Sequence, residues 1–200
     1  MTYCWALLIG YALGSINFAV LVAKSKGLDL FAVGSGNPGA TNVKRTMGAF
    51  WGNTVFLLDF SKGFFAVFLA QYFFGLDEIN SDLLGILGLM GAILGHSFSI
   101  FLRFRGGKGV ATTMGGLLAM MPWVLVIGLI AWLIVFFVTR VVALGSIVFA
   151  ISLPISFYFL HDLSDVRWVF CLILAVLIVF RHYANIQRLL SGNENRFSKK

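Results

Sequence analysis

The first group of residues that could do chemistry lies between residues 34 and 45, in the string GSGNPGATNVKR. Glycines let backbone N–H groups approach an anion closely, because no Cβ stands in the way. The glycines here are Gly34, Gly36 and Gly39, and the neutral hydrogen-bonding side chains are Ser35, Asn37, Thr41 and Asn42. Arg45 ends the string with a guanidinium fork suited to phosphate. The sequence therefore predicts an anion-binding loop, with a flexible linker as the alternative.

The same string also fits the pattern G-x-G-x-x-G. A dinucleotide-binding fold requires a strand before this pattern and a βαβ unit around it. The residues before Gly34 are not patterned as a strand, and the chain leaves no room for such a unit. We therefore exclude a dinucleotide fold.

A second glycine segment lies in GHSFSIFLRFRGGKGVAT, residues 95–112. Its polar end is the run Arg105, Gly106, Gly107, Lys108 and Gly109, directly before an apolar stretch. We expect this run at a helix N-terminus, where free amides and the helix dipole favour an anion. His96 is predicted one to two turns away, inside a membrane span, where ionisable residues are often functional. The alternatives are a topology anchor for the cations and a structural role for His96.

A third polar segment, RHYANIQRLLSGNENRF, occupies residues 181–197. Arg181, Asn185 and Arg188 recur at helical spacing and should share one face. A basic helix on the membrane surface would explain the arginines. It would not explain His182 and Asn185 beside them, so this segment is a third candidate for the site.

Asp59 and Lys62 fall inside an apolar stretch, at DFSKG. Unpaired charges are costly at membrane depth, and residues three apart on a helix can pair, so we predict a structural ion pair. Ser146 lies in another apolar stretch, where small polar residues often serve helix packing. The three histidines lack ligand partners at metal-binding spacing, and Cys4 and Cys171 lie in apolar segments. We predict no metal and no cofactor.

The elements that position these residues must be membrane helices. Of the 200 residues, 60% are hydrophobic and 12% charged, whereas soluble domains carry about 25% charged residues. We place apolar spans at about 3–23, 53–74, 83–102, 110–121, 123–139, 141–160 and 166–181. The net charge of +7 sits at span ends, which is typical of membrane topology and not of nucleic-acid binding. The expected fold is all-α, a polytopic membrane helix bundle with a single domain over residues 1–200.

Residues 110–139 decide the number of spans. One helix over them would be about 45 Å long, well beyond the ~30 Å hydrocarbon core. A turn at Met120-Met121-Pro122 would give two spans instead, since proline favours the first turn of a helix. With seven transmembrane helices and the N-terminus outside, every Lys and Arg except Lys62 and Arg167 lies on the cytoplasmic side. The opposite side then carries the acidic residues Asp77, Glu78, Asp82, Asp162 and Asp165.

A single span over residues 110–139 would move the basic C-terminus outside and break the positive-inside bias. We therefore predict seven spans with the C-terminus cytoplasmic. This topology places all three polar segments on the cytoplasmic face of a bacterial inner membrane.

In their order, their spacing and the total length of the chain, the three segments resemble the signature segments of the bacterial acyl-phosphate:glycerol-3-phosphate acyltransferases. The resemblance implies an integral membrane enzyme of seven spans. Such an enzyme transfers a fatty acyl group from acyl-phosphate to the sn-1 hydroxyl of glycerol-3-phosphate. The products are lysophosphatidic acid and inorganic phosphate, in the first step of bacterial phospholipid synthesis. The implied partners are these two substrates and bilayer lipid, and we expect a monomer.

The resemblance also assigns roles to matching positions. The predicted catalytic set is Ser35, Arg45, Ser146, His182 and Asn185. For phosphate binding the resemblance assigns Gly106, Gly107, Lys108 and Gly109. The chemistry of the residues themselves adds Gly34, Gly36, Asn37, Gly39, Thr41, Asn42, His96, Arg105 and Arg181 to the predicted phosphate-binding set. Glu194 matches an acid linked to structural integrity, and Asp59 and Lys62 are kept as structural. The chain departs from the family's usual pattern at Arg105, where Lys is usual, and at Ser99, where Pro is usual.

Two questions stay open at this point. The general base could be His182 or the leaving phosphate itself. A transporter of phosphorylated solutes would share the basic cytoplasmic mouth, but it should also show internal repeats and broken spans in both halves. A non-catalytic lipid-binding protein would leave the phosphate-binding segments, His182 and Asn185 without a purpose.

Overall fold

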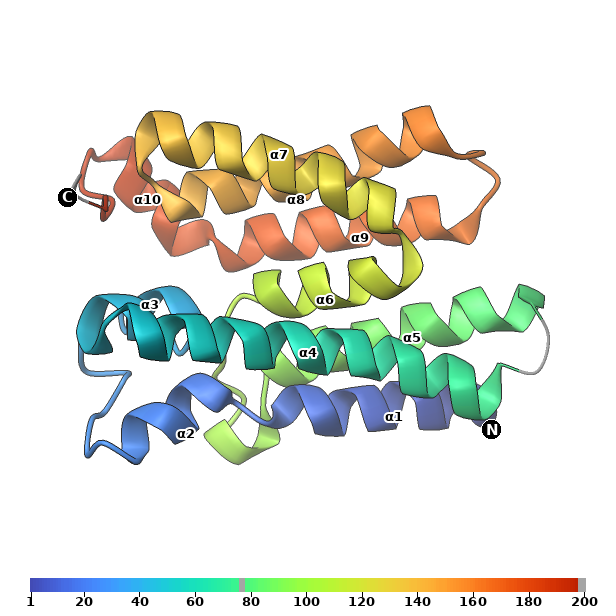
Figure 1. The fold of residues 1–200 in the computed structure, drawn as a ribbon, viewed down its shortest axis with the longest axis horizontal. Helices are drawn as coiled ribbons and strands as arrows, with labels where there is room; N and C mark the ends of the chain where they lie inside the picture. The colour runs from blue at the N-terminus through green and yellow to red at the C-terminus, as the bar shows by residue number, and fades with distance from the viewer. Residues whose placement is uncertain (76–77, 198–200) are drawn as a thin grey trace. The chain divides into compact units, whose positions relative to one another are not determined.

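The computed structural model describes residues 1–75 and 78–197, and every regular element in that part of the chain is a helix (Figure 1). The elements are α1 (Thr2–Ser15), α2 (Phe18–Lys24), α3 (Ala40–Met47), α4 (Ala49–Phe74), α5 (Glu78–Ser97), the 3₁₀ turn η1 (Ile100–Leu102), α6 (Val110–Met120), α7 (Pro122–Thr139), α8 (Val142–Leu160), α9 (Val166–Arg181) and α10 (Tyr183–Leu190). Of the charged residues used to predict topology, Asp77, Lys199 and Lys200 lie outside the described residues, and Glu78 is described by its backbone alone.

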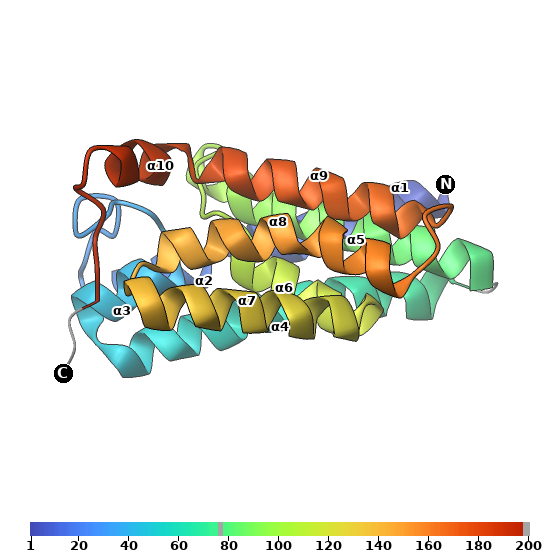
Figure 2. The same ribbon diagram turned by 90° about the horizontal axis from the view of Figure 1, so that it is seen from above.

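The chain folds as two compact units, Met1–Met120 and Met121–Lys200. In the first unit α1 packs against α4 and α5, and α4 also packs against α6. In the second unit α8 packs against both α7 and α9, as Figure 2 shows. The predicted all-α fold is confirmed.

Five segments of the described chain are long and apolar enough to cross a bilayer. They are Thr2–Lys24, Ala49–Phe74, Ser81–Leu102, Pro122–Thr139 and Val142–Leu160. α9 and α10 would add a sixth if they form one span bent by 58°. α6 has 11 residues, which gives a length of about 16 Å, roughly half of the hydrocarbon core. The helix therefore falls short of the predicted span over residues 110–121, and the count of seven spans stays a prediction.

The turn predicted at Met120-Met121-Pro122 is confirmed. α6 ends at Met120, Met121 is the N-cap of α7, and Pro122 is its first residue. The first N–H groups of a helix have no intrahelical partner, so the missing N–H of proline costs nothing at this position. Proline thus divides residues 110–139 into two helices.

Glycines let the helices of the first unit touch backbone to backbone. A Cβ added to Gly10 would lie 2.1 Å from the carbonyl oxygen of Gly88 in α5, and one on Gly14 would lie 2.1 Å from that of Ala92. Between α4 and α6, a Cβ on Gly115 would lie 1.8 Å from the carbonyl oxygen of Phe60. Small residues at such crossings are typical of helix packing in membranes, where association depends on close van der Waals contact.

Replacing Gly115 by Ala is expected to push α6 away from α4 and to lower the thermal unfolding temperature in detergent. The new methyl group would collide with backbone atoms, which cannot rotate away, and overpacking of this kind costs about 1–3 kcal/mol. Leu118→Ala is the matched control on the same helix, because that side chain is 44% exposed. Equal unfolding temperatures for the wild type and Gly115→Ala would contradict the packing of α4 on α6.

Candidate functional site

The first glycine segment is an ordered loop closed by the side chain of Asn42. This side chain is buried, and its Nδ2 donates hydrogen bonds to the carbonyl oxygens of Leu30 (3.3 Å) and Val33 (3.0 Å). Its Oδ1 accepts one from the backbone N–H of Ser35 at 2.9 Å. Both N–H groups of the amide are thus used inside the loop. Asn42 orders the loop, whereas the sequence had suggested a donor to phosphate.

The glycines of this loop are needed for its shape. Gly34 and Gly36 have φ values of +60° and +67°, which L residues with a side chain rarely adopt. A Cβ on Gly34 would also lie 2.2 Å from Asn42 Oδ1. After Gly39 the chain turns into α3, so Thr41 and Arg45 are helical. The prediction of a loop reaching to residue 45 was wrong in its second half, where the helix now fixes the direction of Arg45.

The predicted span at residues 3–23 is not one continuous helix. α1 ends at Ser15 and α2 begins at Phe18, with Asn17 as its N-cap accepting the N–H of Val20 at 2.9 Å. Such a break frees carbonyl oxygens that must find donors inside a membrane protein. Ser99 Oγ donates to the carbonyl oxygen of Ser15 at 2.8 Å. The departure from proline at position 99 therefore supplies a donor that proline lacks.

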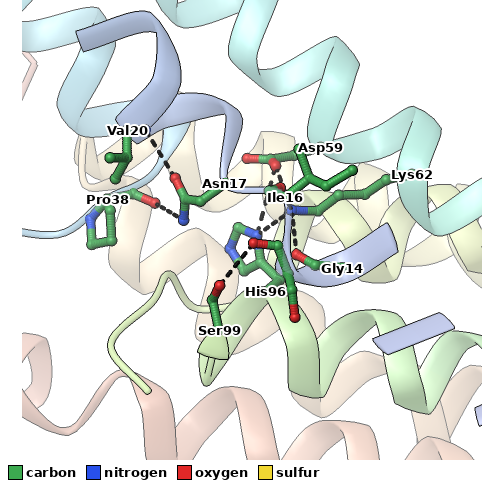
Figure 3. Close-up of polar contacts among 10 residues, drawn as sticks. Gly14, Ile16, Asn17, Val20, Pro38, Asp59, Lys62, His96 and Ser99 are labelled. Carbon is green, nitrogen blue, oxygen red and sulfur yellow. Dashed lines mark hydrogen bonds and ion pairs between the residues drawn. The ribbon is translucent and has the colours of Figure 1, made fainter. Parts of the chain in front are cut away.

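The break contacts both glycine segments of the first unit, as Figure 3 shows. Asn17 Nδ2 donates to the carbonyl oxygen of Pro38, in the first segment, at 3.4 Å. Ser99, which bonds Ser15, belongs to the second segment. A third link is Arg105, whose guanidinium carbon lies 4.2 Å from the centre of the Phe31 ring. A planar guanidinium stacks on an aromatic ring in a way that an ammonium group does not, so the departure from Lys at this position adds a contact.

The predicted ion pair between Asp59 and Lys62 is present, with Nζ 2.8 Å from Oδ1. The sequence prediction missed that His96 joins it, with Nδ1 2.9 Å from Lys62 Nζ. Lys62 also donates to the carbonyl oxygens of Gly14 (3.1 Å) and Ile16 (3.0 Å) at the end of α1. No spacing in the sequence could reveal this cluster, because its members come from three helices.

The glycine run of the second segment, Gly106–Gly109, lies directly against His96. The N–H of Gly107 donates to the carbonyl oxygen of His96 at 3.1 Å. A Cβ on Gly106 would lie 2.2 Å from that oxygen, and one on Gly107 would lie 2.2 Å from His96 Nε2. Lys108 and Gly109 immediately precede α6, as the sequence predicted. The segment thus combines a cation, close backbone packing and a helix N-terminus, which are the parts of an anion site.

In the second unit, Ser146 is buried within α8. Its hydroxyl donates to the carbonyl oxygen of Val142 at 2.9 Å and accepts from Trp132 Nε1 at 3.4 Å. His182 joins α9 to α10, and its Nδ1 lies 2.8 Å from the carbonyl oxygen of Ile178. A carbonyl can only accept, so Nδ1 carries the proton and Nε2 is the acceptor in the neutral ring.

Glu194 organises the end of the third segment. Its carboxylate is buried, with Oε1 accepting from Asn185 Nδ2 at 3.0 Å and Oε2 from Arg188 Nε at 2.9 Å. The predicted shared face of Asn185 and Arg188 is therefore bound by one carboxylate. Arg181 ends α9 one residue before His182.

Replacing Glu194 by Ala is expected to release α10 from the tail that follows it. Two donors would lose their acceptor, and an unsatisfied buried donor costs about 1–3 kcal/mol. Glu194→Gln keeps one oxygen for Asn185 and should retain more stability. Hydrogen exchange of residues 183–190, together with thermal unfolding, measures the effect. Asn193→Ala is the neighbouring control. If the amides of residues 183–190 exchange equally slowly in both variants, Glu194 does not have this structural role.

The model of a known family, glycerol-3-phosphate acyltransferase, matches residues 4–192. The chain belongs to this family. Among its curated relatives, the glycerol-3-phosphate acyltransferase of Aquifex aeolicus is 43% identical over 199 residues, covering 98% of this chain and 100% of the relative. That of Thermosipho melanesiensis is 42% identical over 196 residues, covering 98% and 93%. The resemblance found in the three segments is thereby confirmed for the whole chain.

The fold of this acyltransferase is also known from crystal structures of PlsY (YgiH), an integral membrane glycerol 3-phosphate acyltransferase. Its glycerol 3-phosphate form superposes with a TM-score of 0.89 at 40% identity, covering 99% of this chain and 96% of that one. Its lysophosphatidic acid form gives a TM-score of 0.87 at 39% identity, covering the same shares of the two chains. The chain is therefore an integral membrane acyltransferase of phospholipid biosynthesis.

Each unit of the acyltransferase brings together part of the predicted site. In the first unit the break after α1 contacts both glycine segments, and Arg105 of the second segment contacts Phe31, just before the first. His96 packs against the run Gly106–Gly107. The second unit joins Asn185 to Glu194 and fixes the ring of His182. The role of each residue in the reaction stays a prediction.

Proposed function

We propose that this chain transfers a fatty acyl group from acyl-phosphate to the sn-1 hydroxyl of glycerol-3-phosphate. The products are lysophosphatidic acid and inorganic phosphate. The observation that carries this proposal is the likeness, over 99% of the chain, to an enzyme with both a glycerol 3-phosphate form and a lysophosphatidic acid form. Those two molecules differ by one acyl group, so they are the acceptor and the product of a single transfer.

Phosphate as the leaving group is supported by the cations and glycine loops of the first unit. Arg45, Arg105 and Lys108 lie in two glycine segments, and Arg105 of the second contacts Phe31, three residues before the first. With a thioester donor the leaving group is a thiolate, so glycerol-3-phosphate alone would bring a phosphate close to the reacting carbonyl. Two segments suit two anionic substrates, and cations held in place would offset the repulsion between them.

The reaction needs alignment more than activation, because acyl-phosphate is a mixed anhydride. The acceptor hydroxyl attacks the acyl carbonyl, its oxygen–carbon bond forms, and the carbon–oxygen bond to phosphate breaks. Holding the two substrates in line can supply roughly 7–11 kcal/mol of the barrier. Arg45, Arg105 and the loop amides would stabilise the departing phosphate, and Lys108 would hold the phosphate of glycerol-3-phosphate. Ser35, Ser146 and Asn185 would orient oxygens.

The hydroxyl proton passes to the departing phosphate or to His182. We favour the phosphate, because Nδ1 of His182 donates to the backbone carbonyl oxygen of Ile178, at 2.8 Å, and such a group does not strengthen the base as a carboxylate would. We therefore expect His182→Gln to lower kcat by less than about tenfold, since losing a general base costs about 10²- to 10⁴-fold. A larger fall in kcat at unchanged KM, with loss of the corresponding limb of the pH profile, would make His182 the base.

The proposal places this chemistry on the cytoplasmic face of a bacterial inner membrane, with seven spans and the N-terminus outside. The acidic connection between α8 and α9 carries Asp162 and Asp165, whereas Arg140 and the C-terminal segment are basic. This asymmetry supports the orientation, because cytoplasmic loops are enriched in Lys and Arg. A reporter fused to the C-terminus should be active in the cytoplasm, and an extracytoplasmic signal would refute the topology.

The decisive experiment incubates the purified protein with acyl-phosphate and glycerol-3-phosphate and measures phosphate and lysophosphatidic acid together. Equal amounts of both products are expected, and none with acyl-CoA as donor. Equal rates with acyl-CoA would overturn the donor assignment. Uptake of glycerol-3-phosphate into proteoliposomes, without product, would favour a transporter instead.

A further inference from the structure

Three ionisable side chains are buried together in the first unit (Figure 3), and one of them, His96, packs against Gly106 and Gly107. Asp59 is 2% exposed, His96 4% and Lys62 5%. Asp59 and Lys62 lie in α4, and His96 lies in the last turn of α5. Ionisable residues are expensive within a membrane protein, so a buried set of three calls for a use beyond helix packing.

The contacts of Lys62 fix the direction of every hydrogen bond in the cluster. An ammonium group only donates, so each neighbour must accept. The neighbours are the carbonyl oxygens of Gly14 and Ile16, at 3.1 and 3.0 Å, the carboxylate of Asp59, at 2.8 Å, and Nδ1 of His96, at 2.9 Å. His96 Nδ1 lies 3.6 Å from Asp59 Oδ1, beyond hydrogen-bond distance. Lys62 is therefore the partner that sets the state of this nitrogen.

The tautomer of His96 follows from that contact. A neutral imidazole carries one proton, and if Nδ1 accepts from Lys62 the proton must be on Nε2. Nε2 faces the glycine segment, because a Cβ on Gly107 would lie 2.2 Å from it. The ring thus presents an N–H donor to the backbone that leads into Lys108. The opposite tautomer would turn a lone pair toward a site built for anions.

We propose that Asp59 and Lys62 are positioning residues for the phosphate of glycerol-3-phosphate. They hold His96 as its Nε2–H tautomer, so that the ring supports the segment Gly106–Gly109 as a donor. Asp59 neutralises the buried ammonium and fixes its position. This inference rests on the proposed function in one respect, since it takes that segment as the glycerol-3-phosphate subsite.

The tautomer is measured directly by ¹⁵N NMR of the histidine-labelled full chain in detergent micelles. The signals of His96 are those absent from His96→Asn. At neutral pH we expect a protonated Nε2 and an unprotonated Nδ1. The double variant Asp59→Asn/Lys62→Met removes both charges together, which avoids an unpaired buried charge, and it should lose this single tautomer. A wild-type His96 protonated on Nδ1, or on both nitrogens, would overturn the proposal.

Kinetics separate positioning from a merely structural role. In the double variant the KM for glycerol-3-phosphate should rise at least about tenfold, because a ground-state contact to that substrate is lost. By the same reasoning, kcat and the KM for acyl-phosphate should change less than about threefold. The control is Asp165→Asn/Arg167→Met, which removes the ion pair at the start of α9. Equal losses for both substrates would indicate a structural role only.

A second pair of variants covers the case in which the double variant fails to fold. The amide nitrogen of Gln can replace Nε2 of histidine, whereas that of Asn replaces Nδ1. His96→Gln should therefore keep a lower KM for glycerol-3-phosphate than His96→Asn, and equal values would overturn the proposal. If the wild type makes no lysophosphatidic acid, the proposed function fails. The ¹⁵N signals of His96, recorded with and without glycerol-3-phosphate, still test the tautomer and the effect of that ligand on the ring.

Discussion

Replacing Lys108 by Met is expected to lower kcat/KM for glycerol-3-phosphate by about 10²- to 10³-fold, a loss comparable to that of one preorganised donor to an oxyanion. Lys108 lies two residues before the first residue of α6, so its ammonium and the free amides of that helix would act on the same phosphate. Met fills a similar volume without charge, so the unfolding temperature should stay close to that of the wild type. Steady-state kinetics with acyl-phosphate, together with thermal unfolding, test both statements.

Two further variants show whether the effect of Lys108 is local. Lys24→Met removes the same charge from an exposed site at the end of α2 and should leave kcat/KM unchanged. Lys108→Arg keeps the charge but changes the donor geometry, so it should fall between Met and the wild type. If Lys24→Met and Lys108→Met lose activity equally, the cations act only through the general surface potential, and Lys108 is not a ligand of phosphate.

Replacing Gly106 by Ala is expected to raise the KM for glycerol-3-phosphate by about 10- to 100-fold, since a displacement near 1 Å can cost about 10²-fold. The added Cβ would meet the carbonyl oxygens of His96 at 2.2 Å and Ser97 at 2.7 Å. Both are backbone atoms, so the glycine segment itself must shift. Kinetics in which each substrate is varied in turn would show the change for glycerol-3-phosphate and little change for acyl-phosphate.

Gly27→Ala is the contrasting control for Gly106→Ala. Gly27 has a φ of +69° and nothing within 4 Å of an added Cβ, so Ala there strains the backbone without any collision. A rise in KM for Gly106→Ala alone would tie affinity to the packing of the segment on His96. Unchanged KM values in Gly106→Ala would exclude the segment as a tightly packed phosphate subsite.

Local signals in the sequence predicted the large features of the fold. Apolar length and the position of Pro122 were enough to place α4 to α9 and the helix break between α6 and α7, because both depend on neighbouring residues alone. The same was true of Asp59 and Lys62, which are one helical turn apart. Features that depend only on residues close in sequence could therefore be predicted from the sequence alone.

The prediction failed where a residue depends on distant partners. The break after Ser15 is stable because Lys62 and Ser99 donate to the freed carbonyls, from positions 46 to 84 residues further along the chain. Asn17 is a good N-cap residue, and it was the one local signal that could have revealed the break. The contact of His96 with Lys62 had no such signal, and neither did the use of Asn42 inside its own loop.

The break after α1 also sets an order of events during synthesis. The first apolar segment, Thr2–Lys24, leaves the ribosome well before Lys62 and Ser99 are made. Until then the carbonyls of Gly14, Ser15 and Ile16 lack the donors that satisfy them in the finished protein. Until α4 and the end of α5 arrive, water, the insertion machinery or a continuous helix must supply those donors. In a variant that lacks those donors, membrane proteases would act on the chain before it has finished folding. We therefore expect a lower amount of protein in the membrane before any loss of activity per molecule.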